Sequence, residues 1–450
     1  MSQSIPEKIK KNIPNKTLGI FNKFTQAGLE IYLVGGAVRD LLLGQKNITN
    51  LDFTTNATPK EIQTLFSKSF YDNQYGTVKI PYKNDVIEIT TYRCEHGYSD
   101  FRHPDKIIWG KTLEEDLKRR DFTINAIALG PLKLIDLFDG QKDLKSKLIR
   151  CVGNPDKRFG EDALRILRAI RFATRLEFEI EPKTFTVLTK NTSLLANISG
   201  ERIREELFKI LLDENIDRGF QLMKEAKILD QILPEVTKGY GMKQKGHHIW
   251  NVWKHSVLAV KYCPSNDPIV KLATLLHDVG KPVVVKNING ERTFYNHEVI
   301  GASIARNIGQ RLRLSNKDLD LLTRLVRWHQ FSVSEKQTNK AIKRFIRHVG
   351  KENIHDMLDL RTGDRLGSGA KLTSWRLEKF KKRLIEVQKQ PFIVTDLKIN
   401  GRDVMKILKI SPGPKVGQVL NEIFAKVDNG TLPNERKILL GEIKKHLTRS

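Results

Sequence analysis

The sequence is poor in cysteine and contains no long apolar run. Its three cysteines, Cys94, Cys151 and Cys263, lie far apart in a chain of 450 residues. This spacing does not form a disulfide framework and is typical of a reducing compartment. No apolar run approaches the roughly 18 residues of a membrane span, and the first residues lack the apolar core of a signal peptide. We therefore expect a soluble, cytoplasmic protein.

Internal repeats and low-complexity linkers are missing as well. Hydrophobic residues make up 39% of the chain, which allows a sizeable core and argues against extensive disorder. At about 150 residues per domain, the length suggests roughly three packing units. Because no flexible linker separates these units, we expect an elongated multidomain body.

Positive charge is in excess, and most of it lies in the second half of the chain. The 78 Lys and Arg residues outnumber the 52 Asp and Glu residues, giving a net charge of +26. Such an excess favours a polyanionic partner, either nucleic acid or an anionic membrane surface. Residues 1–140 carry +2, residues 141–230 carry +3, residues 231–370 carry +11 and residues 371–450 carry +10. With no amphipathic segment or anchor in the sequence, nucleic acid is the favoured partner.

Hydrophobic periodicity divides the chain into an α/β part and a helical part. Residues 30–44 predict a strand, a glycine turn and a helix. Further β-rich runs lie at residues 50–55, 76–81, 85–92 and 123–137. From Arg158 onward the apolar residues recur with a helical period, so nearly all of the remaining chain is expected to be helical. The first such helix has an apolar face made of Leu164, Leu167, Ile170 and Ala173.

Two short basic segments of the α/β part suit phosphate binding. Backbone N–H groups at Gly35-Gly36 could approach a phosphate closely, and Arg39 follows one helical turn later. Arg120 could neutralise a triphosphate, and Asp121 could accept a hydrogen bond from a ribose hydroxyl. Taken singly, a glycine pair before a helix is more often a structural turn, and a basic pair is more often a surface feature.

Acidic residues on two predicted strands suit metal binding. Side chains two residues apart on a strand point to one face, as in Asn50-Leu51-Asp52. Carboxylates at such positions, with a third on a neighbouring strand, would hold two magnesium ions for phosphoryl transfer. Glu88, between two isoleucines, is the candidate third ligand. On spacing alone, a solvated strand face is the commoner explanation for Glu88.

A helix predicted over residues 161–171 offers groups that could recognise a base. Asp162 and Arg165 are three residues apart and would share one face. Together, a carboxylate and a guanidinium could contact the Watson–Crick edge of cytosine or adenine. Arg168 and Arg171 could reach phosphate. From the pattern alone, an intrahelical ion pair between Asp162 and Arg165 is the commoner explanation.

Seven motifs follow one another between about residues 30 and 230. They are GGAVRD, an x-Asp-Phe strand followed by TTNATP, IEITTYR, RRDFTINA, IDLFDGQKDL, RFGEDALRILRAIRFA and ISGERIREEL. Through them the chain resembles class II tRNA nucleotidyltransferases, the CCA-adding enzymes and the closely similar bacterial poly(A) polymerases. The resemblance implies an α/β nucleotidyltransferase head with a polymerase-β-like mixed sheet (1–140) and an all-α neck with a nucleotide-selecting helix (141–230).

The same resemblance implies roles for individual residues. Asp52 and Glu88 are expected to be catalytic and to bind Mg²⁺. The residues expected to bind the nucleotide are Gly35, Gly36, Arg39, Arg120, Asp121, Asn125, Asp162, Arg165, Arg168 and Arg171, and the resemblance itself assigns all of them except Gly35, Asp121 and Asn125. Asn50 departs from the family, which has Asp-x-Asp at this strand, and a neutral side chain there should weaken metal binding. Asn50 could mark an engineered inactive variant, a charge supplied by a neighbouring loop, or a natively impaired head.

A second group of candidate ligands lies between residues 247 and 364. His255, His277-Asp278 and Asp364 resemble the pattern of an HD-type phosphohydrolase domain, and His297 and His329 match the extra ligands of versions that bind two metals. The resemblance implies an HD body (231–370) that binds a divalent metal of unidentified kind, with Lys281 near enough to hold a phosphate. The alternative is a helical scaffold without turnover. His247 and His248 match no ligand position.

The C-terminal segment, residues 371–450, resembles the basic helical tail of Gram-positive-like family members. We expect it to contact the tRNA backbone. The predicted reaction transfers CMP and AMP from CTP and ATP to the tRNA 3′ end without a nucleic acid template. Three alternatives stay open: a poly(A) polymerase or an enzyme adding only CC or only A, an HD phosphohydrolase acting on RNA ends with an impaired head, and a non-catalytic RNA-binding protein.

Overall fold

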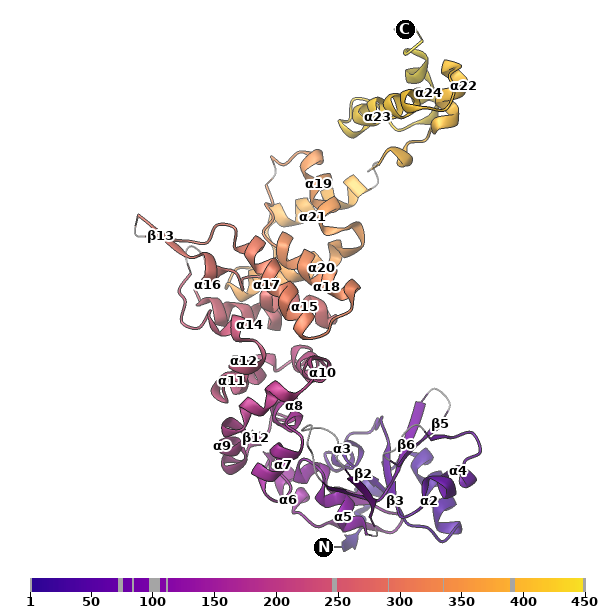
Figure 1. Cartoon of the computed structure of the whole chain (residues 1–450), viewed down its shortest axis with the longest axis vertical. Coiled ribbons are helices and arrows are strands. Elements are labelled where there is room, and N and C mark those ends of the chain that lie inside the picture. The colour runs from indigo at the N-terminus through magenta and orange to yellow at the C-terminus, as the bar shows by residue number, and fades with distance from the viewer. Residues whose placement is uncertain are drawn as a thin grey trace. The chain divides into compact units, whose positions relative to one another are not determined.

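The computed structural model of the chain is drawn in Figure 1. It describes residues 2–71, 76–82, 85–96, 106–110, 112–244, 249–289, 291–334, 336–388 and 393–447, with side chains left out at 94–96 and 106–108. His247 and His248 lie outside the described residues. The chain forms two compact units, one made of residues 1–238 and 308–314 and the other of residues 239–307 and 315–450. The finer division into head, neck, body and tail stays a prediction.

A mixed sheet of eight described strands forms the first part of the first unit, in the order β1-β10-β9-β2-β3-β6-β5-β4. At its centre β3 (Asp52–Thr55) runs antiparallel to β2 (Ile31–Val34) and parallel to β6 (Asp85–Thr91). The other strands are β1 (Ser2–Ser4), β4 (Phe70–Tyr71), β5 (Thr77–Tyr82), β9 (Ile127–Leu129) and β10 (Lys133–Asp136). The predicted mixed sheet is thereby confirmed, and β7 (Arg93–His96) pairs separately with β8 (Lys106–Trp109).

Alternation along β6 separates the core of this sheet from its polar surface. Ile87 and Ile89 are completely buried, whereas Glu88 between them is only partly buried. Phe53 of β3 is buried beside them and meets Phe21 edge to face. The helices that accompany the sheet are α1 (Glu7–Lys10), α2 (Asn15–Gln26), α3 (Gly36–Leu42), α4 (Pro59–Leu65), α5 (Leu113–Lys118) and α6 (Gly140–Lys145).

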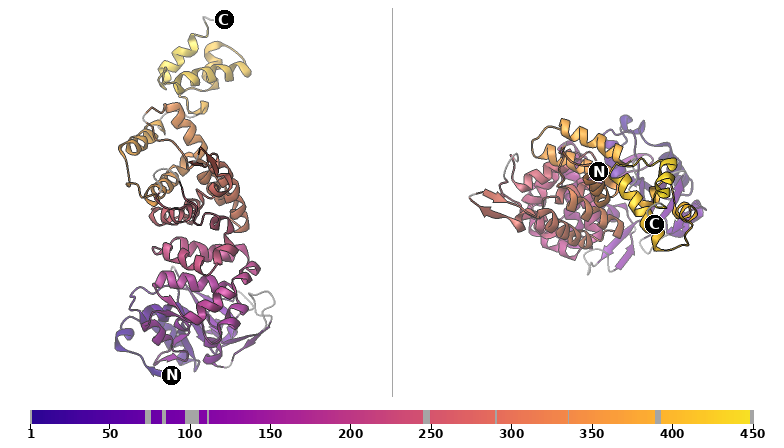
Figure 2. Two further views of the ribbon diagram at one scale, coloured as in Figure 1. Left: turned by 90° about the vertical axis from the view of Figure 1, so that its left-hand side faces the viewer. Right: turned by 90° about the horizontal axis from the view of Figure 1, so that it is seen from above.

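Helices make up most of the remainder of the first unit (Figures 1 and 2). The central one, α8 (Leu164–Leu176), buries the four apolar positions that the sequence predicted and packs against α10 (Gly200–Leu211) and α11 (Ile216–Glu225). Its neighbours are α7 (Pro155–Glu161), α9 (Pro182–Lys190), α12 (Ile228–Ile232) and α13 (Pro234–Thr237). Two short parallel strands, β11 (Leu148–Ile149) and β12 (Glu179–Ile180), pair here, and β12 is a small exception in a region expected to be nearly all helical.

The second unit is built around two closely packed helices, α14 (Val252–Tyr262) and α20 (Ile354–Gly367). A Cβ atom at Gly363 or Gly367 of α20 would collide with the backbone of Ala259 in α14, so glycine permits the close approach. The surrounding helices are α15 (Pro268–Leu276), α16 (Lys281–Val284), α17 (His297–Arg311), α18 (Asn316–Trp328) and α19 (Asn339–Val349). A hairpin of β13 (Lys286–Ile288) and β14 (Glu291–Thr293) again departs from the expected helical pattern.

The C-terminal part of the second unit has a small apolar core of its own. After α21 (Trp375–Gln388), this core joins α22 (Gly401–Leu408), α23 (Pro414–Asp428) and α24 (Arg436–Lys444). The turn predicted at residues 411–414 separates α22 from α23, as expected. Among the described residues, no helix is both long enough and apolar enough to cross a lipid bilayer.

Candidate active site and metal centre

The glycine turn after β2 brings three predicted site residues together. Gly35 has φ +72°, a conformation that side chains other than glycine rarely adopt, and it precedes α3 directly. A Cβ atom at Gly35 would lie 3.3 Å from a guanidinium nitrogen of Arg120 and 3.8 Å from Oδ2 of Asp52. Glycine therefore gives the turn its shape and leaves room for the two charged groups.

Strand register places two carboxylates side by side. Asp52 of β3 and Glu88 of β6 are direct partners in the parallel ladder. Burial raises the pKa of Asp52 to about 6, and Arg120, which lowers this pKa, outweighs the opposing effect of Glu88. Two neighbouring carboxylates on a polar strand face form an all-oxygen donor set, which is the type that Mg²⁺ prefers. The residues present therefore fit the magnesium site that the sequence predicted.

The position of Asn50 differs from the prediction. We expected Asn50 and Asp52 on one face of a single strand, but β3 begins only at Asp52. Asn50 is exposed and has φ +53°, a left-handed conformation that asparagine tolerates better than most residues. Asn50 therefore lies in the turn before the strand.

A buried chain of hydrogen bonds connects four predicted nucleotide-binding residues. Arg39 donates to Oδ1 of Asn125 at 2.9 Å, and Asn125 donates to Oδ1 of Asp121 at 3.1 Å. Arg168 donates twice to Oδ2 of Asp121, at 2.9 and 2.6 Å. Burial favours a higher pKa for Asp121, but the charge and hydrogen bonds of Arg168 together with Asn125 lower it to about 2. The Phe122 N–H donates to Oδ1 of Asp121, so all four acceptor positions of this carboxylate are occupied. A ribose hydroxyl could therefore donate to it only by displacing one of these donors.

Phe172 lies within this group, and the sequence analysis did not single it out. The guanidinium carbons of Arg39, Arg168 and Arg171 lie 5.2, 5.4 and 4.1 Å from the centre of its ring. Contacts between a guanidinium and an aromatic face at such distances are attractive, and they add to the ion pairs that Arg168 and Arg171 make with Asp121 and Glu206. Arg171 also donates to Glu206 of α10 at 2.5 Å. The sequence feature that could have identified Phe172 is its position four residues after Arg168.

The predicted helix over residues 161–171 is interrupted. Helix α7 ends at Glu161 and α8 begins at Leu164, while Asp162 between them is extended, with φ −144°. The Asp162 carboxylate accepts the Leu164 N–H at 3.1 Å, and such local bonds favour helix starts over helix interiors. The expectation that Asp162 and Arg165 share one face of a continuous helix is therefore wrong.

Asp162 and Arg165 also have separate partners. Two guanidinium nitrogens of Arg202, from α10, donate to the Asp162 carboxylate at 3.2 and 3.0 Å. Arg165 donates to Glu161 at 2.9 Å, and its other contacts are the backbone carbonyls of Arg158 and Arg119. The sequence analysis used ISGERIREEL only as a family marker and so missed Arg202.

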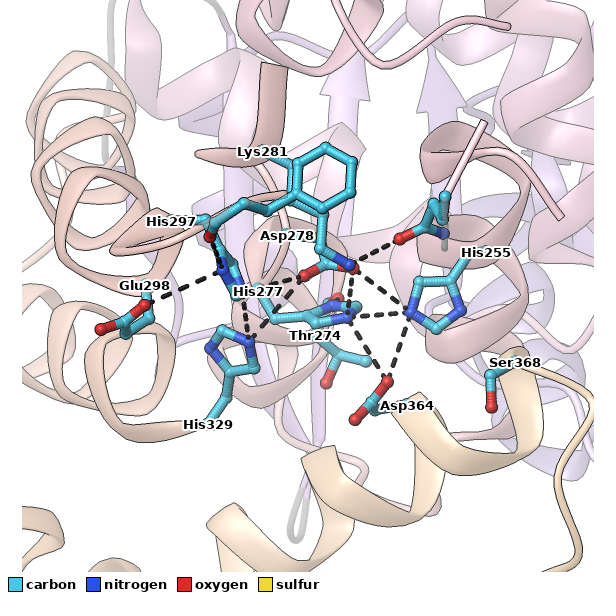
Figure 3. Close-up of polar contacts among 12 residues, drawn as sticks. His255, Thr274, His277, Asp278, Lys281, His297, Glu298, His329, Asp364 and Ser368 are labelled. Carbon is cyan, nitrogen blue, oxygen red and sulfur yellow. Dashed lines mark hydrogen bonds and ion pairs between the residues drawn. The ribbon is translucent and has the colours of Figure 1, made fainter. Parts of the chain in front are cut away.

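The six candidate metal ligands of the second unit converge in a single cluster (Figure 3). They form two groups, His255, His277 and Asp364 in one, and Asp278, His297 and His329 in the other. In the first group Nε2 of His255 lies 3.0 Å from Nε2 of His277 and 3.3 Å from Oδ1 of Asp364.

Asp278 lies between the two groups. Its Oδ2 is 3.3 Å from Nε2 of His277, and its Oδ1 is 3.4 Å from Nε2 of His297. In the second group Nε2 of His297 and Nε2 of His329 are 3.3 Å apart. Asp278 would therefore be able to contribute a carboxylate oxygen to a cation held by either group.

Backbone carbonyls orient three of the imidazoles. Nδ1 of His277, His297 and His329 lies 2.7, 2.8 and 2.8 Å from the carbonyl oxygens of Thr274, Phe294 and Val326, respectively. These carbonyls accept hydrogen bonds from Nδ1–H, which leaves the Nε2 lone pair directed into the cluster. Metal-binding histidines are commonly fixed in this way.

Electrostatics act differently on the members of the cluster: burial opposes the charged form of His277, but Asp278 raises the pKa of this imidazole. Burial, reinforced by His277, lowers the pKa of His329 to about 3, so its imidazole is neutral. Although burial opposes ionisation, His277 and Lys281 keep the pKa of Asp278 well below its ordinary value. Lys281 donates to Oδ2 of Asp278 at 2.6 Å. Imidazole nitrogens beside carboxylate oxygens are donor types that suit divalent cations, and a metal at this cluster stays a prediction.

A cavity of about 640 Å³ opens over this cluster. Its lining includes five of the six ligands, together with residues that follow β14 and residues from α20. The further lining residues are Gln244, Lys281, Arg292, Thr293, Phe294, Tyr295, Asn296, Glu298, Gln330 and Arg361. The candidate metal centre is thus accessible to a ligand.

Three family models match the chain. The poly(A) polymerase head domain matches residues 31–150, and tRNA nucleotidyltransferase domain 2 matches residues 300–443. Residues 177–239 match the model described as "Probable RNA and SrmB-binding site of polymerase A". The first match covers the strands and turns that carry Gly35, Asp52, Glu88 and Arg120.

Known relatives match over nearly the whole length. The CCA-adding enzyme of Ligilactobacillus salivarius is 33% identical over 464 residues, which covers 99% of this chain and 98% of the relative. That of Pediococcus pentosaceus is 32% identical over 428 residues, covering 95% and 96%. The crystal structure of the Bacillus stearothermophilus CCA-adding enzyme in complex with CTP has a TM-score of 0.70 at 28% identity and 99% coverage of both chains. The chain therefore belongs to the family of CCA-adding enzymes, class II tRNA nucleotidyltransferases.

Proposed function

We propose that this protein adds CCA to tRNA, transferring CMP and AMP from CTP and ATP to the tRNA 3′ end without a nucleic acid template. The observation that carries the proposal is the match to CCA-adding enzymes over 99% of the chain. The tRNA 3′-hydroxyl attacks the α-phosphate of the nucleotide, and pyrophosphate leaves. A poly(A) polymerase and an enzyme adding only CC or only A are not favoured by these relatives.

The residues around the glycine turn have separate proposed roles in catalysis by the head. Asp52 and Glu88 would hold Mg²⁺, which when bound supplies positive charge for the attacking oxygen and the leaving group. The N–H groups at Gly35 and Gly36, at the start of α3, suit phosphate oxygens. Arg120, close to both Gly35 and Asp52, is placed to contact the triphosphate. Because Asn50 is neutral, one negative charge of the family site is missing.

Base selection follows from the bonding capacity that remains on Asp162 and Arg165. The carboxylate of Asp162 has three of about four acceptor positions filled, by Leu164 N–H and by Arg202. Arg165 uses both Nη1 protons and one Nη2 proton on its own partners. One acceptor and the remaining guanidinium donors are therefore left, which matches the exocyclic amine and ring acceptors that cytosine and adenine share.

Nucleotide incorporation tests this function. A tRNA that lacks its last three nucleotides is incubated with Mg²⁺ and CTP, ATP or both, and the products are resolved on a sequencing gel. We expect two additions with CTP alone and three with both nucleotides. A long ladder of added adenosines would indicate a poly(A) polymerase, and extension limited to CC or to A would indicate an enzyme that adds only those nucleotides. Binding of tRNA without extension would indicate a non-catalytic protein.

The basic C-terminal segment is proposed to bind the tRNA backbone. Residues 371–450 carry a net charge of +10, and this charge is spread over several helices and is not confined to one motif. Such contacts attract phosphates without sequence preference. A cytoplasmic location, which we also propose, is compatible with a tRNA substrate and with the buried free thiols of Cys151 and Cys263.

A second activity is proposed for the metal centre, that of an HD-type phosphohydrolase acting on RNA ends. The observation that supports it is the cluster of six ligands with Asp278 between its two halves. Two divalent cations, when bound, would supply Lewis acidity for hydrolysis of a phosphoester. Lys281 holds the Asp278 carboxylate in place, and the backbone carbonyls keep the imidazoles oriented.

Metal content and hydrolysis test this second activity separately from the first. We expect about two divalent ions per chain by elemental analysis, and hydrolysis of an RNA that ends in a 2′,3′-cyclic phosphate. His277→Ala should lose both, whereas His355→Ala, at an exposed histidine of the same unit, should lose neither. Hydrolysis that is unchanged in His277→Ala would remove the proposal and leave CCA addition unaffected.

A further inference from the structure

We propose that the cavity over the metal centre binds a nucleoside phosphate, with the phosphate at the metal ligands and the base stacked on Tyr295. This inference rests on the proposed phosphohydrolase activity and adds to it the residue that would recognise the base. It assigns a role to a residue that takes no part in metal binding.

Tyr295 is held close to the cluster and presents its ring to solvent. It precedes the ligand His297 by two residues, a separation of at most about 7 Å along the chain. The neighbouring Phe294 is fixed, because its carbonyl bonds to Nδ1 of His297 at 2.8 Å. The Tyr295 side chain is 74% exposed although it lines the cavity. Among the described residues it has no ring contact and no hydrogen bond.

An exposed aromatic ring at the mouth of a polar cavity suits base stacking. Every nucleobase has a flat π face, and stacking on an aromatic side chain is tolerant of sequence. Covering the Tyr295 ring with a base would also remove apolar surface from water. Inorganic phosphate or a sugar phosphate could not use this ring in the same way.

The charges that line the cavity suit a phosphate only when metal is bound. Asp278, Asp364 and Glu298 contribute three negative charges, and the cations Lys281, Arg292 and Arg361 contribute three positive charges. Apart from the histidines, the lining is therefore neutral. Divalent cations at the cluster would make it strongly positive, and a phosphate would then be attracted to the end of the cavity nearest the ligands.

The size of the cavity agrees with a nucleotide. Its volume of about 640 Å³ lies within the range of roughly 300 to 1,000 Å³ that is typical of small-ligand sites. A phosphate group alone would leave most of this space unfilled. The amide of Gln330, also in the lining, offers both a donor and an acceptor to a base or sugar edge.

Calorimetric titration of the metal-loaded full-length protein tests the stacking role. The probes are the phosphonate analogues of AMP and of ribose 5-phosphate, in which carbon replaces the ester oxygen so that neither is hydrolysed. The binding heat that remains in the Asp278→Ala variant is assigned to nucleotide binding at the head and is subtracted. We expect the AMP analogue to bind at least tenfold more tightly than the ribose analogue. Tyr295→Ala should abolish this difference, and Tyr295→Phe should retain it.

The controls separate this inference from the activity on which it rests. Tyr262→Ala, at a half-exposed tyrosine ending α14, should leave both affinities unchanged, and Tyr295→Ala should keep its full metal content. Equal affinity of the wild-type protein for the two analogues, with metal bound, overturns the stacking role alone. Absence of bound metal overturns both proposals. A short RNA that ends in the same phosphonate is then tested as a competitor. If it competes better than the mononucleotide, the ligand is an RNA end, and if it competes less well, the ligand is a free nucleotide.

Discussion

At the scale of single residues, Asn50 is the position where the head departs from the pattern of the family. It lies in the turn before β3, two residues before Asp52 in the sequence. This position is outside the ladder that pairs Asp52 with Glu88. A carboxylate at position 50 would restore the third negative charge of the family site. The left-handed backbone is compatible with aspartate as well as asparagine.

Asn50→Asp should therefore raise the rate of nucleotide incorporation. We expect an increase of about tenfold or more at limiting Mg²⁺, because an added charge strengthens metal binding. Single-turnover incorporation across a magnesium titration measures it. Asn47→Asp, which adds the same charge to an exposed position nearby, serves as control, and equal rates for wild type and Asn50→Asp would show that the asparagine is no impairment.

Asp121 predicts how stability depends on pH. Its pKa is lowered to about 2 in the folded protein and is about 3.9 when unfolded. The carboxylate thus contributes about 2 to 3 kcal/mol above pH 4, and this contribution is lost as pH falls from about 4 to about 2. Urea unfolding followed by circular dichroism between pH 2 and 7 should show this loss in the wild type and in Asp230→Asn. The same slope in Asp121→Asn would contradict it.

At the scale of structural elements, the turn between β2 and α3 can be tested against a matched glycine. Gly35→Ala should lower incorporation at least tenfold, because the new methyl group meets Arg120 at 3.3 Å and the backbone has φ +72°. Gly44→Ala has φ +83° but nothing within 4 Å. It therefore shares the backbone strain without the contact. If both variants lose activity equally, strain alone explains the effect.

The junction between α7 and α8 gives a prediction about nucleotide choice. Arg202 holds the Asp162 carboxylate by two hydrogen bonds, so Arg202→Ala should leave the carboxylate misdirected. We expect about a tenfold loss of discrimination between CTP and UTP, measured as the ratio of kcat/KM values. Arg218→Ala, which removes an ion pair to Glu179 elsewhere in the same unit, should keep the ratio. An unchanged ratio in Arg202→Ala would show that Asp162 needs no such support.

Elements of this fold differ in how far sequence alone predicts them. The strand, glycine turn and helix at residues 30–44 and the apolar face of α8 follow from local patterns, and the structure has them. The break at Asp162 was missed because helical periodicity on both sides conceals a side chain that caps the second helix. Contacts of Phe172 and Arg202 join distant segments, and a single sequence contains no record of such contacts.

At the scale of the whole molecule, the distribution of charge predicts how tRNA binding responds to salt. Each phosphate contact contributes up to about one unit to the slope of log Kd against log salt concentration. Replacing four exposed lysines of the C-terminal segment by alanine should lower this slope by about two to three. The four are Lys379, Lys382, Lys415 and Lys437.

The matched control replaces four exposed lysines of residues 1–230, which carry a net charge of only +5. These are Lys60, Lys68, Lys133 and Lys183. Filter binding of tRNA from 50 to 300 mM salt gives both slopes. An equal reduction in the two quadruple variants would mean that net charge, and not the basic segment, determines the salt dependence.

The pairing of Asp52 with Glu88 has a consequence for how this chain can vary over evolutionary time. Their adjacency depends on the parallel register of β3 and β6, which fixes residue 52 opposite residue 88. One codon gained or lost within β6 would shift that register and turn the glutamate to the opposite face of the sheet. Insertions and deletions among descendants of this gene should therefore accumulate between β3 and β6 and be rare within either strand.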